Sequence, residues 1–117
     1  MGPDEVTRFE MRESEDGDGV LRLSLTGELD LLGADRLTAR LGELKSAGTP
    51  LRLDLSRLEF IDSSGLNALI STAHAGRSNG WRLEVDRRVH PQVERVIELV
   101  GAWPYIWPPD PAPPPES

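Results

Sequence analysis

Two kinds of apolar pattern take turns along this chain. Residues 21–26 and 51–56 alternate leucine with polar residues, which is the pattern of a strand that buries one face. Residues 34–44, 66–73 and 93–100 instead repeat an apolar residue every three or four positions, as a helix with one buried stripe does. A chain in which strands and helices alternate in this way is predicted to form an α/β fold, with helices packed on a sheet.

The order of these segments predicts how the strands pair. A short strand around residues 9–11 is joined to the strand at 21–26 by an acidic, glycine-rich turn at 13–19, so we expect these two strands to run antiparallel. Helices separate the later strands, including one at 81–85, so those strands are expected to run parallel. A last short strand is predicted at 103–107, confined to a sheet edge by a proline that cannot donate a backbone hydrogen bond. The expected sheet is therefore mixed, with four or five strands.

A length of 117 residues suits one domain with a core of its own. We expect that domain to cover residues 6–107. Residues 1–5 are predicted to be a flexible N-terminus, and residues 108–117 a disordered C-terminal tail, because proline-rich sequence cannot form a helix or a strand ladder. The aromatic residues within 103–107 are interpreted as a cover for the core rather than as an aromatic binding patch.

Charge and composition disfavour several classes of partner. The 13 basic and 20 acidic residues give a net charge of −7, which disfavours direct binding to nucleic acid, since that depends on lysine and arginine at phosphates. No apolar run approaches the length that spans a bilayer, and the first residues do not form a secretory signal, so the expected location is the cytoplasm. Cysteine is absent, and His74 and His90 lack a carboxylate at ligand spacing. We therefore expect no metal and no cofactor.

The junction between the third strand and the second helix is the main candidate for a functional site. A buried strand ends at Ile61, and a helix begins within Asp62-Ser63-Ser64-Gly65. Aspartate and serine are good N-cap residues, and glycine allows a tight turn. Open α/β sheets place their sites at the carboxyl ends of strands, and a helix N-terminus favours an anion. A serine here either caps the helix or receives a phosphoryl group, and the local chemistry leaves both open.

Three motifs occur in order along the chain. They are Leu25-Thr26-Gly27-Glu28-Leu29-Asp30, then Asp54-Leu55-Ser56 with Phe60-Ile61-Asp62-Ser63-Ser64-Gly65-Leu66, and then residues 91–101. Together they resemble the signature of STAS domains, most closely the anti-sigma factor antagonists of the SpoIIAA and RsbV type. The resemblance covers about residues 6–107, and it implies the STAS fold and a regulatory protein rather than an enzyme.

This resemblance implies a switch that works by phosphorylation. In the family, the first serine of the Asp-Ser-Ser-Gly motif is phosphorylated by a partner that is both serine kinase and anti-sigma factor. That serine corresponds to Ser63, with Ser64 as the less favoured acceptor and the expected helix cap. The unphosphorylated domain binds the anti-sigma factor and thereby releases the sigma factor. The phosphorylated domain dissociates from the anti-sigma factor, and a serine phosphatase restores the unphosphorylated form.

Acidic residues are expected to share one rim with the serines, so that a phosphate there adds to an existing negative field. Asp30 either helps to position the partner's reacting groups or caps the first helix, and Asp62 is interpreted as a cap that organises the loop. Gly27 is interpreted as a backbone position, as is Gly65. The acidic set is Glu28, Asp30, Glu59 and Asp62, and the expected partner-binding set is Glu28, Asp30, Asp62, Ser63, Ser64, Gly65 and Leu66.

Two other functions compete with the switch. An enzyme needs an activated serine, but Ile61 stands where a Gly-x-Ser-x-Gly elbow has its first glycine, and no glycine-rich phosphate loop occurs. A STAS scaffold or adaptor, in a signalling assembly or a lipid-transport system, needs the same fold without a sigma-factor partner. The complete Asp-Ser-Ser-Gly motif favours the phosphorylation switch over that alternative.

Overall fold

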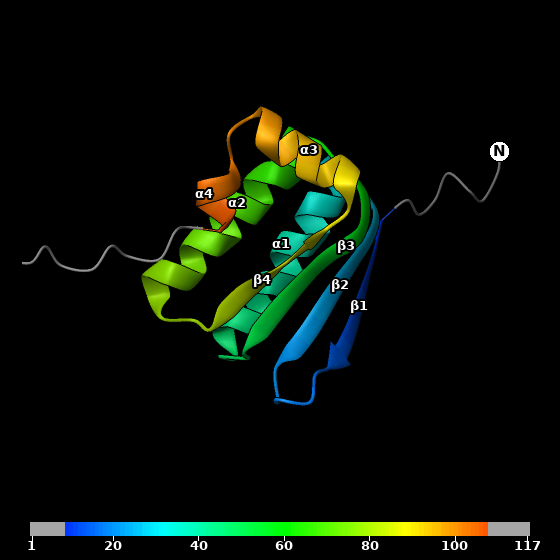
Figure 1. The fold of residues 1–117 in the computed structure, drawn as a ribbon. Helices are drawn as coiled ribbons and strands as arrows, with labels where there is room; N and C mark the ends of the chain where they lie inside the picture. Colours follow the sequence, from blue (N-terminus) through cyan, green and yellow to red (C-terminus); the bar gives the residue numbers. More distant parts are fainter. Residues whose placement is uncertain (1–8, 108–117) are drawn as a thin grey trace, which may run out of the picture.

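The computed structural model describes residues 9–107, and the predictions for residues 1–5 and 108–117 lie outside the described part. Its elements are β1 (Phe9–Glu15), β2 (Leu21–Leu29), α1 (Leu31–Ser46), β3 (Leu51–Ile61), α2 (Ser63–Asn79), β4 (Leu83–Val89), α3 (Pro91–Leu99) and α4 (Trp103–Ile106). The strands form one sheet in the order β1-β2-β3-β4, with β1 and β2 antiparallel and the other neighbours parallel. The predicted α/β fold and its pairing directions are confirmed (Figure 1).

The core lies between the sheet and its helices. α1 and α2 lie side by side against the sheet, and α3 crosses the end of this helical layer (Figure 1). The leucines that alternate along β2 and β3 point into the core, and Leu23 and Leu53 are completely buried, as are Leu37 of α1, Leu69 of α2 and Ile97 of α3. Each such side chain contributes roughly 1.5–3 kcal/mol through its removal from water, so the periodicity of the sequence identifies the core correctly.

Two irregularities in the pairing of β2 with β3 decide which residues near the end of β3 are buried. The register moves by one residue twice along these strands, so that Glu28 lies opposite Phe60. Each extra residue in β3 resets the alternation of its side chains between the two faces. Leu58 and Ile61 are consequently both buried, whereas Phe60, which the sequence places in the same apolar stretch, is 48% exposed.

Residues 103–107 do not form the predicted edge strand. Residues 103–106 form the short helix α4 with Pro104 in its first turn, where the missing N–H of proline costs nothing because first-turn N–H groups have no intrahelical acceptor. Trp107 is buried, and its indole Nε1 donates to the Val85 carbonyl of β4 at 2.9 Å. The described sheet therefore has four strands, and the interpretation of this segment as a cover for the core is confirmed for Trp107.

The acidic turn between β1 and β2 is shorter than predicted. β1 continues to Glu15, and its Glu13 carboxylate accepts a hydrogen bond from the Arg40 guanidinium of α1 at 2.8 Å. The turn occupies residues 16–20, where Gly19 has a φ of 82°. Glycine adopts this left-handed conformation without steric cost, so it suits the tight reversal.

A network of ion pairs crosses the polar face of the sheet. Arg22 of β2 contacts Asp16 of the turn at 3.0 Å, Asp54 of β3 at 3.1 Å and Asp86 of β4 at 3.5 Å. Arg52 of β3 also pairs with Asp16. The turn and three strands are thus joined by charged groups that lie on alternate positions of the strands, opposite to the buried leucines.

This network predicts that the folded chain loses stability in acid. Hydrogen bonds from Arg22 and then Arg52 hold the pKa of Asp16 below its usual range. Because the folded pKa is depressed, the associated stability is present above the unfolded value of about 4 and is lost as the pH falls through the folded pKa. We expect the melting temperature, measured by circular dichroism, to stay level from pH 7 to pH 5 and to fall below about pH 4.

The matched variants are Arg22→Gln and Arg57→Gln. Arg22→Gln removes the shared partner of three carboxylates, so it should lower the melting temperature at pH 7 and make the decline in acid shallower. Arg57 is exposed on β3 and has no ion pair within residues 9–107, so Arg57→Gln should follow the unmodified chain. An Arg22→Gln profile parallel to that of the unmodified chain would contradict this account.

Candidate functional site

The ends of β2 and β3 bring the site residues together. Leu29 and Ile61 are the last residues of these strands and lie opposite each other. The Asp62 backbone N–H donates to the Leu29 carbonyl at 3.1 Å, so the loops at Asp30 and Asp62 leave the sheet side by side. Each loop leads directly into a helix, α1 after Asp30 and α2 after Asp62. The site therefore lies at the carboxyl edge of the parallel strands, as the sequence predicts.

Both of these aspartates are helix caps. The Asp30 side chain accepts a hydrogen bond from the Gly33 N–H at 3.0 Å, and the Asp62 side chain accepts one from the Gly65 N–H at 2.9 Å. Both residues have the extended backbone typical of an N-cap. The capping interpretation is confirmed for both, whereas the expectation that Ser64 caps α2 is wrong, because Asp62 holds that position and Ser64 lies inside the first turn.

With the cap supplied by Asp62, neither serine is needed for that task. Ser63 and Ser64 are the first two residues of α2, and Ser63 is exposed while Ser64 is half-buried. Ser63 thus sits at the N-terminus of a 17-residue helix, where a negative charge is stabilised by about 0.3–1 kcal/mol. The geometry allows Ser63 to present its hydroxyl to a partner and to carry an anionic group.

Gly65 is required by the close approach of α2 to the ends of the strands. A Cβ on Gly65 would lie 2.7 Å from the Leu29 carbonyl oxygen and 2.9 Å from Ile61 Cγ1. The φ of Gly65 is not positive, so the predicted tight turn is wrong. Glycine is needed because a larger residue in the first turn of α2 would collide with Leu29 and Ile61. Both Gly65 and Leu66 are buried, so they shape the backbone of the site rather than offer side chains to a partner.

Four acidic residues lie near the same end of the sheet as the two serines. Glu28 is the next-to-last residue of β2, and Asp30 and Asp62 follow the ends of the two central strands. Glu59 is exposed on β3, two residues before its end. The four acidic residues named by the sequence analysis therefore lie at or near one edge of the sheet. A phosphate on Ser63 would add charge to a region that is already negative.

Three exposed apolar side chains also lie at this end of the fold, and the sequence analysis did not assign them to the site. Leu31 and Leu32 open α1 and are 60% and 72% exposed, and Phe60 is 48% exposed near the end of β3. A signal was present for the leucines, since both fall outside the helical stripe that begins at Ala34. Apolar side chains next to a charged rim have the composition of a protein-docking surface.

The histidines have local structural contacts. His90 Nδ1 accepts a hydrogen bond from the Gln92 N–H at 3.2 Å and so caps α3. His74 lies late in α2, 3.2 Å from the Ser78 hydroxyl. Within residues 9–107, no cluster of three or more histidine, aspartate or glutamate side chains is arranged to hold a metal ion. No helix in the same part of the chain has the length and apolar character needed to cross a membrane.

The fold belongs to a known class of domain. The family model described as "Mlab, STAS domain" matches residues 12–102, a span that runs from within β1 to beyond α3. The chain belongs to the STAS domain family, and the resemblance seen in its three motifs is confirmed.

Two anti-sigma factor antagonists are similar to this chain in sequence. The chain is 42% identical over 59 residues to the anti-sigma-F factor antagonist RsfB of Mycobacterium tuberculosis strain H37Rv, a match that covers 50% of this chain and 48% of RsfB. It is 25% identical over 81 residues to the anti-sigma-B factor antagonist of Bacillus subtilis strain 168, covering 69% of this chain and 73% of that protein. The chain thus spans about half the length of RsfB in this match.

Solved structures have the same fold. An anti-sigma factor antagonist from Mycobacterium paratuberculosis is 28% identical, with a TM-score of 0.60 over 86% of this chain and 82% of that one. Unphosphorylated SpoIIAA gives a TM-score of 0.67 at 19% identity, over 82% and 84% of the two chains. The phosphorylated form of SpoIIAA from Bacillus gives 0.63 at 18% identity, over 82% and 87%. At these identities the SpoIIAA structures establish the fold alone.

The contacts of Gly65 predict a measurable cost of substitution. Gly65→Ala should lower the free energy of unfolding by about 1–3 kcal/mol, because the new methyl group meets a backbone oxygen that cannot easily move. Gly42→Ala is the control, since Gly42 lies in α1 and an added Cβ meets nothing within 4 Å. That change should be neutral or raise stability by up to about 1 kcal/mol. Urea denaturation measures both, and equal stability of the two variants would contradict the close-approach argument.

Proposed function

We propose that this chain is an anti-sigma factor antagonist controlled by phosphorylation. Unphosphorylated, it binds an anti-sigma factor that is also a serine kinase, and the sigma factor is thereby released. Phosphorylated on Ser63, it no longer binds, and a serine phosphatase restores the binding form. In this cycle the chain is a substrate and a binding protein, not an enzyme. The observation that carries the proposal is the exposed Ser63 hydroxyl at the first position of α2. It lies at the end of the fold where Leu31, Leu32 and Phe60 expose apolar side chains, which we propose as the docking surface.

Burial distinguishes the two serines as phosphate acceptors. A kinase must bring the phosphoryl group of ATP into line with the serine Oγ atom, so the hydroxyl must be accessible. The surroundings must also have space for the three additional oxygen atoms of the phosphate. Ser63 is exposed, whereas Ser64 is half-buried within the first turn of α2. The exposed position favours Ser63, which also corresponds to the first serine of the family motif.

A phosphate on Ser63 is compatible with the folded state. The cap of α2 depends on Asp62 and not on either serine, so modification of Ser63 removes no side-chain hydrogen bond within residues 9–107. The helix N-terminus also stabilises an anion through its dipole and its unpaired N–H groups. The switch can therefore change binding while the domain stays folded.

The docking surface gives a physical reason for release. Leu31, Leu32 and Phe60 offer apolar area for the partner, and the acidic residues at the rim already repel negative groups. Phosphorylation adds a charge of about −1.5 to −2, which must lose water if the partner covers it. A penalty of about 2.8 kcal/mol is enough to weaken the complex a hundredfold.

Substitution of the two serines tests the proposed acceptor. Ser63→Ala should bind the kinase partner and take up no phosphate from ATP, whereas Ser64→Ala should still be phosphorylated. Ser63→Asp should bind at least about tenfold more weakly, although a single carboxylate carries less charge than a phosphate. Pull-down from a native extract, followed by mass spectrometry and calorimetry with the recovered kinase, measures each of these outcomes.

The same pull-down distinguishes the alternative function. If the unmodified chain, Ser63→Ala and Ser63→Asp recover an identical set of partners, the chain is a STAS scaffold or adaptor and the switch is contradicted. Recovery of an ATP-binding serine kinase by the unmodified chain and Ser63→Ala, but not by Ser63→Asp, supports the switch.

The apolar part of the docking surface is tested by Leu32→Gln. The side chain is 72% exposed, so the substitution should leave the melting temperature within about 2 °C of the unmodified value. Binding to the kinase partner should weaken about fivefold or more, because apolar contact is lost at the interface. Leu99→Gln is the matched control, since Leu99 is 74% exposed at the end of α3. Equal effects of the two variants on affinity would exclude Leu32 from the interface.

A further inference from the structure

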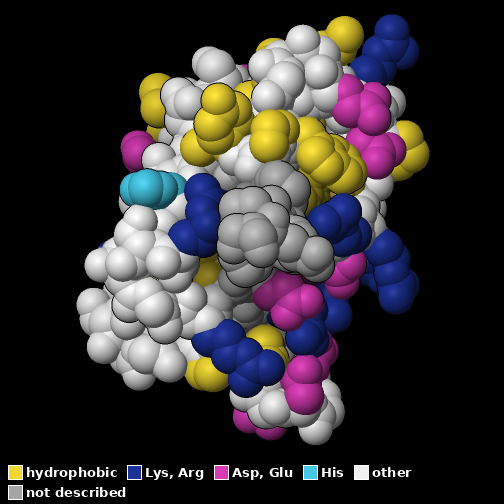
Figure 2. Space-filling view, turned by 60° about the vertical axis from the view of Figure 1, so that its left-hand side comes forward, with side chains coloured by type: hydrophobic (Ala, Val, Ile, Leu, Met, Phe, Trp, Pro, Cys, Tyr) yellow, Lys and Arg dark blue, Asp and Glu magenta, His cyan; other side chains and the backbone are white. Residues whose placement is uncertain are grey.

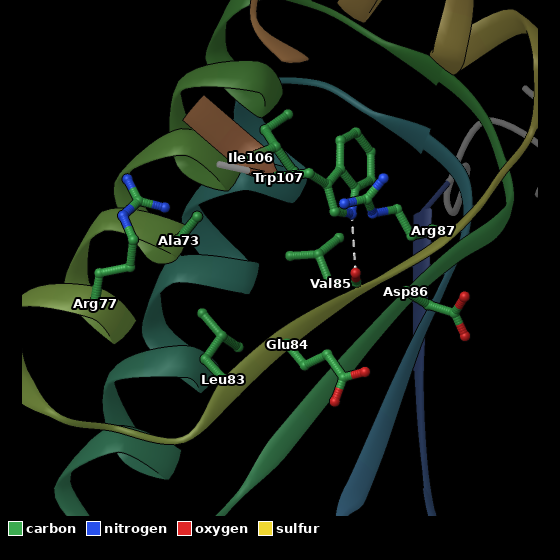
Figure 3. Close-up of a pocket in the computed structure, with 9 residues that line it drawn as sticks. All are labelled: Ala73, Arg77, Leu83, Glu84, Val85, Asp86, Arg87, Ile106 and Trp107. Atoms are coloured by element: carbon green, nitrogen blue, oxygen red, sulfur yellow. Dashed lines mark hydrogen bonds between the residues drawn. The ribbon is translucent and has the colours of Figure 1, made fainter. Parts of the chain in front are cut away.

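A cavity of about 590 Å³ lies along β4, well beyond the first turn of α2 that holds Ser63. Its walls come from α2, β4 and α4, and Figure 3 shows the side chains that surround it. Figure 2 views this side of the molecule, where hydrophobic, basic and acidic side chains all reach the surface. We call this cavity the β4 groove, and its lining residues are Ala73, Arg77, Leu83, Glu84, Val85, Asp86, Arg87, Ile106 and Trp107.

The β4 groove exposes a free strand edge. β4 is the last strand in the sheet order and pairs only with β3. The Arg82 carbonyl faces β3, because it accepts a hydrogen bond from the Leu51 N–H. Backbone groups of successive residues in a strand alternate in direction, so the N–H and carbonyl groups of Leu83 and Val85 face away from β3, into the groove. The Val85 carbonyl is covered by the Trp107 indole at 2.9 Å. The outward N–H groups of Leu83 and Val85 remain as donors without an acceptor in the described residues.

Two arginines give the β4 groove a positive rim. Arg77 of α2 and Arg87 of β4 lie on opposite sides of the cavity (Figure 3). Arg77 donates to the Tyr105 carbonyl at 3.3 Å, and Arg87 lies 5.8 Å from the centre of the Trp103 ring. Within residues 9–107 neither has a carboxylate partner. The acids of the groove are engaged elsewhere, since Asp86 contacts Arg22 and Glu84 contacts Arg52.

We propose that residues 108–117 of this same chain occupy the β4 groove. The segment follows directly on Trp107, which already lines the groove. Its sequence is Pro-Pro-Asp-Pro-Ala-Pro-Pro-Pro-Glu-Ser, so most of its residues offer backbone acceptors without donors, which matches the outward N–H groups of β4. At about 3.1 Å per residue in a polyproline helix, ten residues reach about 31 Å, enough to follow β4 from Arg87 to Leu83.

Charge and aromatic surface support the same occupant. Asp110 follows Trp107 by three residues, about 9 Å of extended chain. That length brings its carboxylate within reach of Arg77 and Arg87, which have no carboxylate partner within residues 9–107. The Trp103 and Trp107 rings lie 4.5 Å apart at the start of the segment, and proline rings pack well on such aromatic surfaces. Residues 108–117 then shield the free edge of β4 from pairing with another strand. This role is independent of the phosphorylation of Ser63.

Amide hydrogen exchange of the full chain tests the proposal. The comparison variant replaces residues 108–117 with glycine and serine at equal length, which avoids a new carboxylate next to Trp107. The Leu83 and Val85 amides should exchange at least about tenfold faster in that variant, while the amide of Leu23 in the sheet centre should be unchanged. Asp110→Asn and Arg77→Gln should each accelerate the same two amides by a smaller factor, and Glu116→Gln, a charge-matched control farther along the segment, should not.

Two results would overturn the proposal. Equal exchange of Leu83 and Val85 in the full chain and the replacement variant shows that residues 108–117 do not cover β4. Protection that rises with protein concentration shows that a second copy supplies the segment instead. Protection that is independent of concentration and sensitive to Asp110→Asn supports the intramolecular arrangement. Since no kinase is needed for this measurement, its failure leaves the proposed phosphorylation switch unaffected.

Discussion

The contact between the beginning of α2 and the end of β2 determines the geometry of the site. The Asp62 N–H binds the Leu29 carbonyl at 3.1 Å, and Gly65 lies so close to the same carbonyl that even a methyl group does not fit. These contacts fix where the first helical turn stands on the sheet. Because Asp62 also supplies the cap, Ser63 stays exposed at the surface, and its hydroxyl makes no hydrogen bond to the described part of the chain.

The periodicity of the sequence predicts the core and the strand directions well, since burial of leucine dominates both. It fails where pairing between strands changes the outcome. The sequence places Phe60 in a buried apolar stretch, but two register irregularities between β2 and β3 turn its side chain outward. The local sequence contains no pattern that predicts these irregularities. Residues 103–107 read as an edge strand, but Pro104 fits a first helical turn equally well, and the Trp107 hydrogen bond to β4 decides the outcome.

At the candidate site, the position of Ser63 at the start of α2 and the capping role of Asp62 follow from residue type and order. For Asp30 the sequence left capping and partner positioning open, and the structure shows the cap. The buried state of Leu66 and the exposure of Leu31 and Leu32 depend on how α1 and α2 lie on the sheet. The ion pairs of Arg22 depend on the strand register. Arginine and aspartate at alternate strand positions suggest such pairs, but the partners can be predicted only once the register is known.

The helix α2 connects the two regions of proposed function. Its first residue carries the hydroxyl of the switch, and Ala73 and Arg77 in its later turns line the β4 groove. The two regions lie at different ends of one rigid element, and nothing in the chemistry of either requires the other. One surface is suited to exchange a partner, and the other is suited to hold a segment of the chain itself. The proposed switch uses this separation, since a change in charge at Ser63 then acts on binding alone.

The most direct measurement of the central claim is the affinity of the kinase partner for chains that carry phosphoserine at a single defined position. Phosphoserine placed genetically at position 63 should weaken binding at least about a hundredfold in calorimetry, with an unchanged circular dichroism spectrum that shows the domain to be folded. A chain phosphorylated at position 63 that binds as tightly as the unmodified chain would contradict the account.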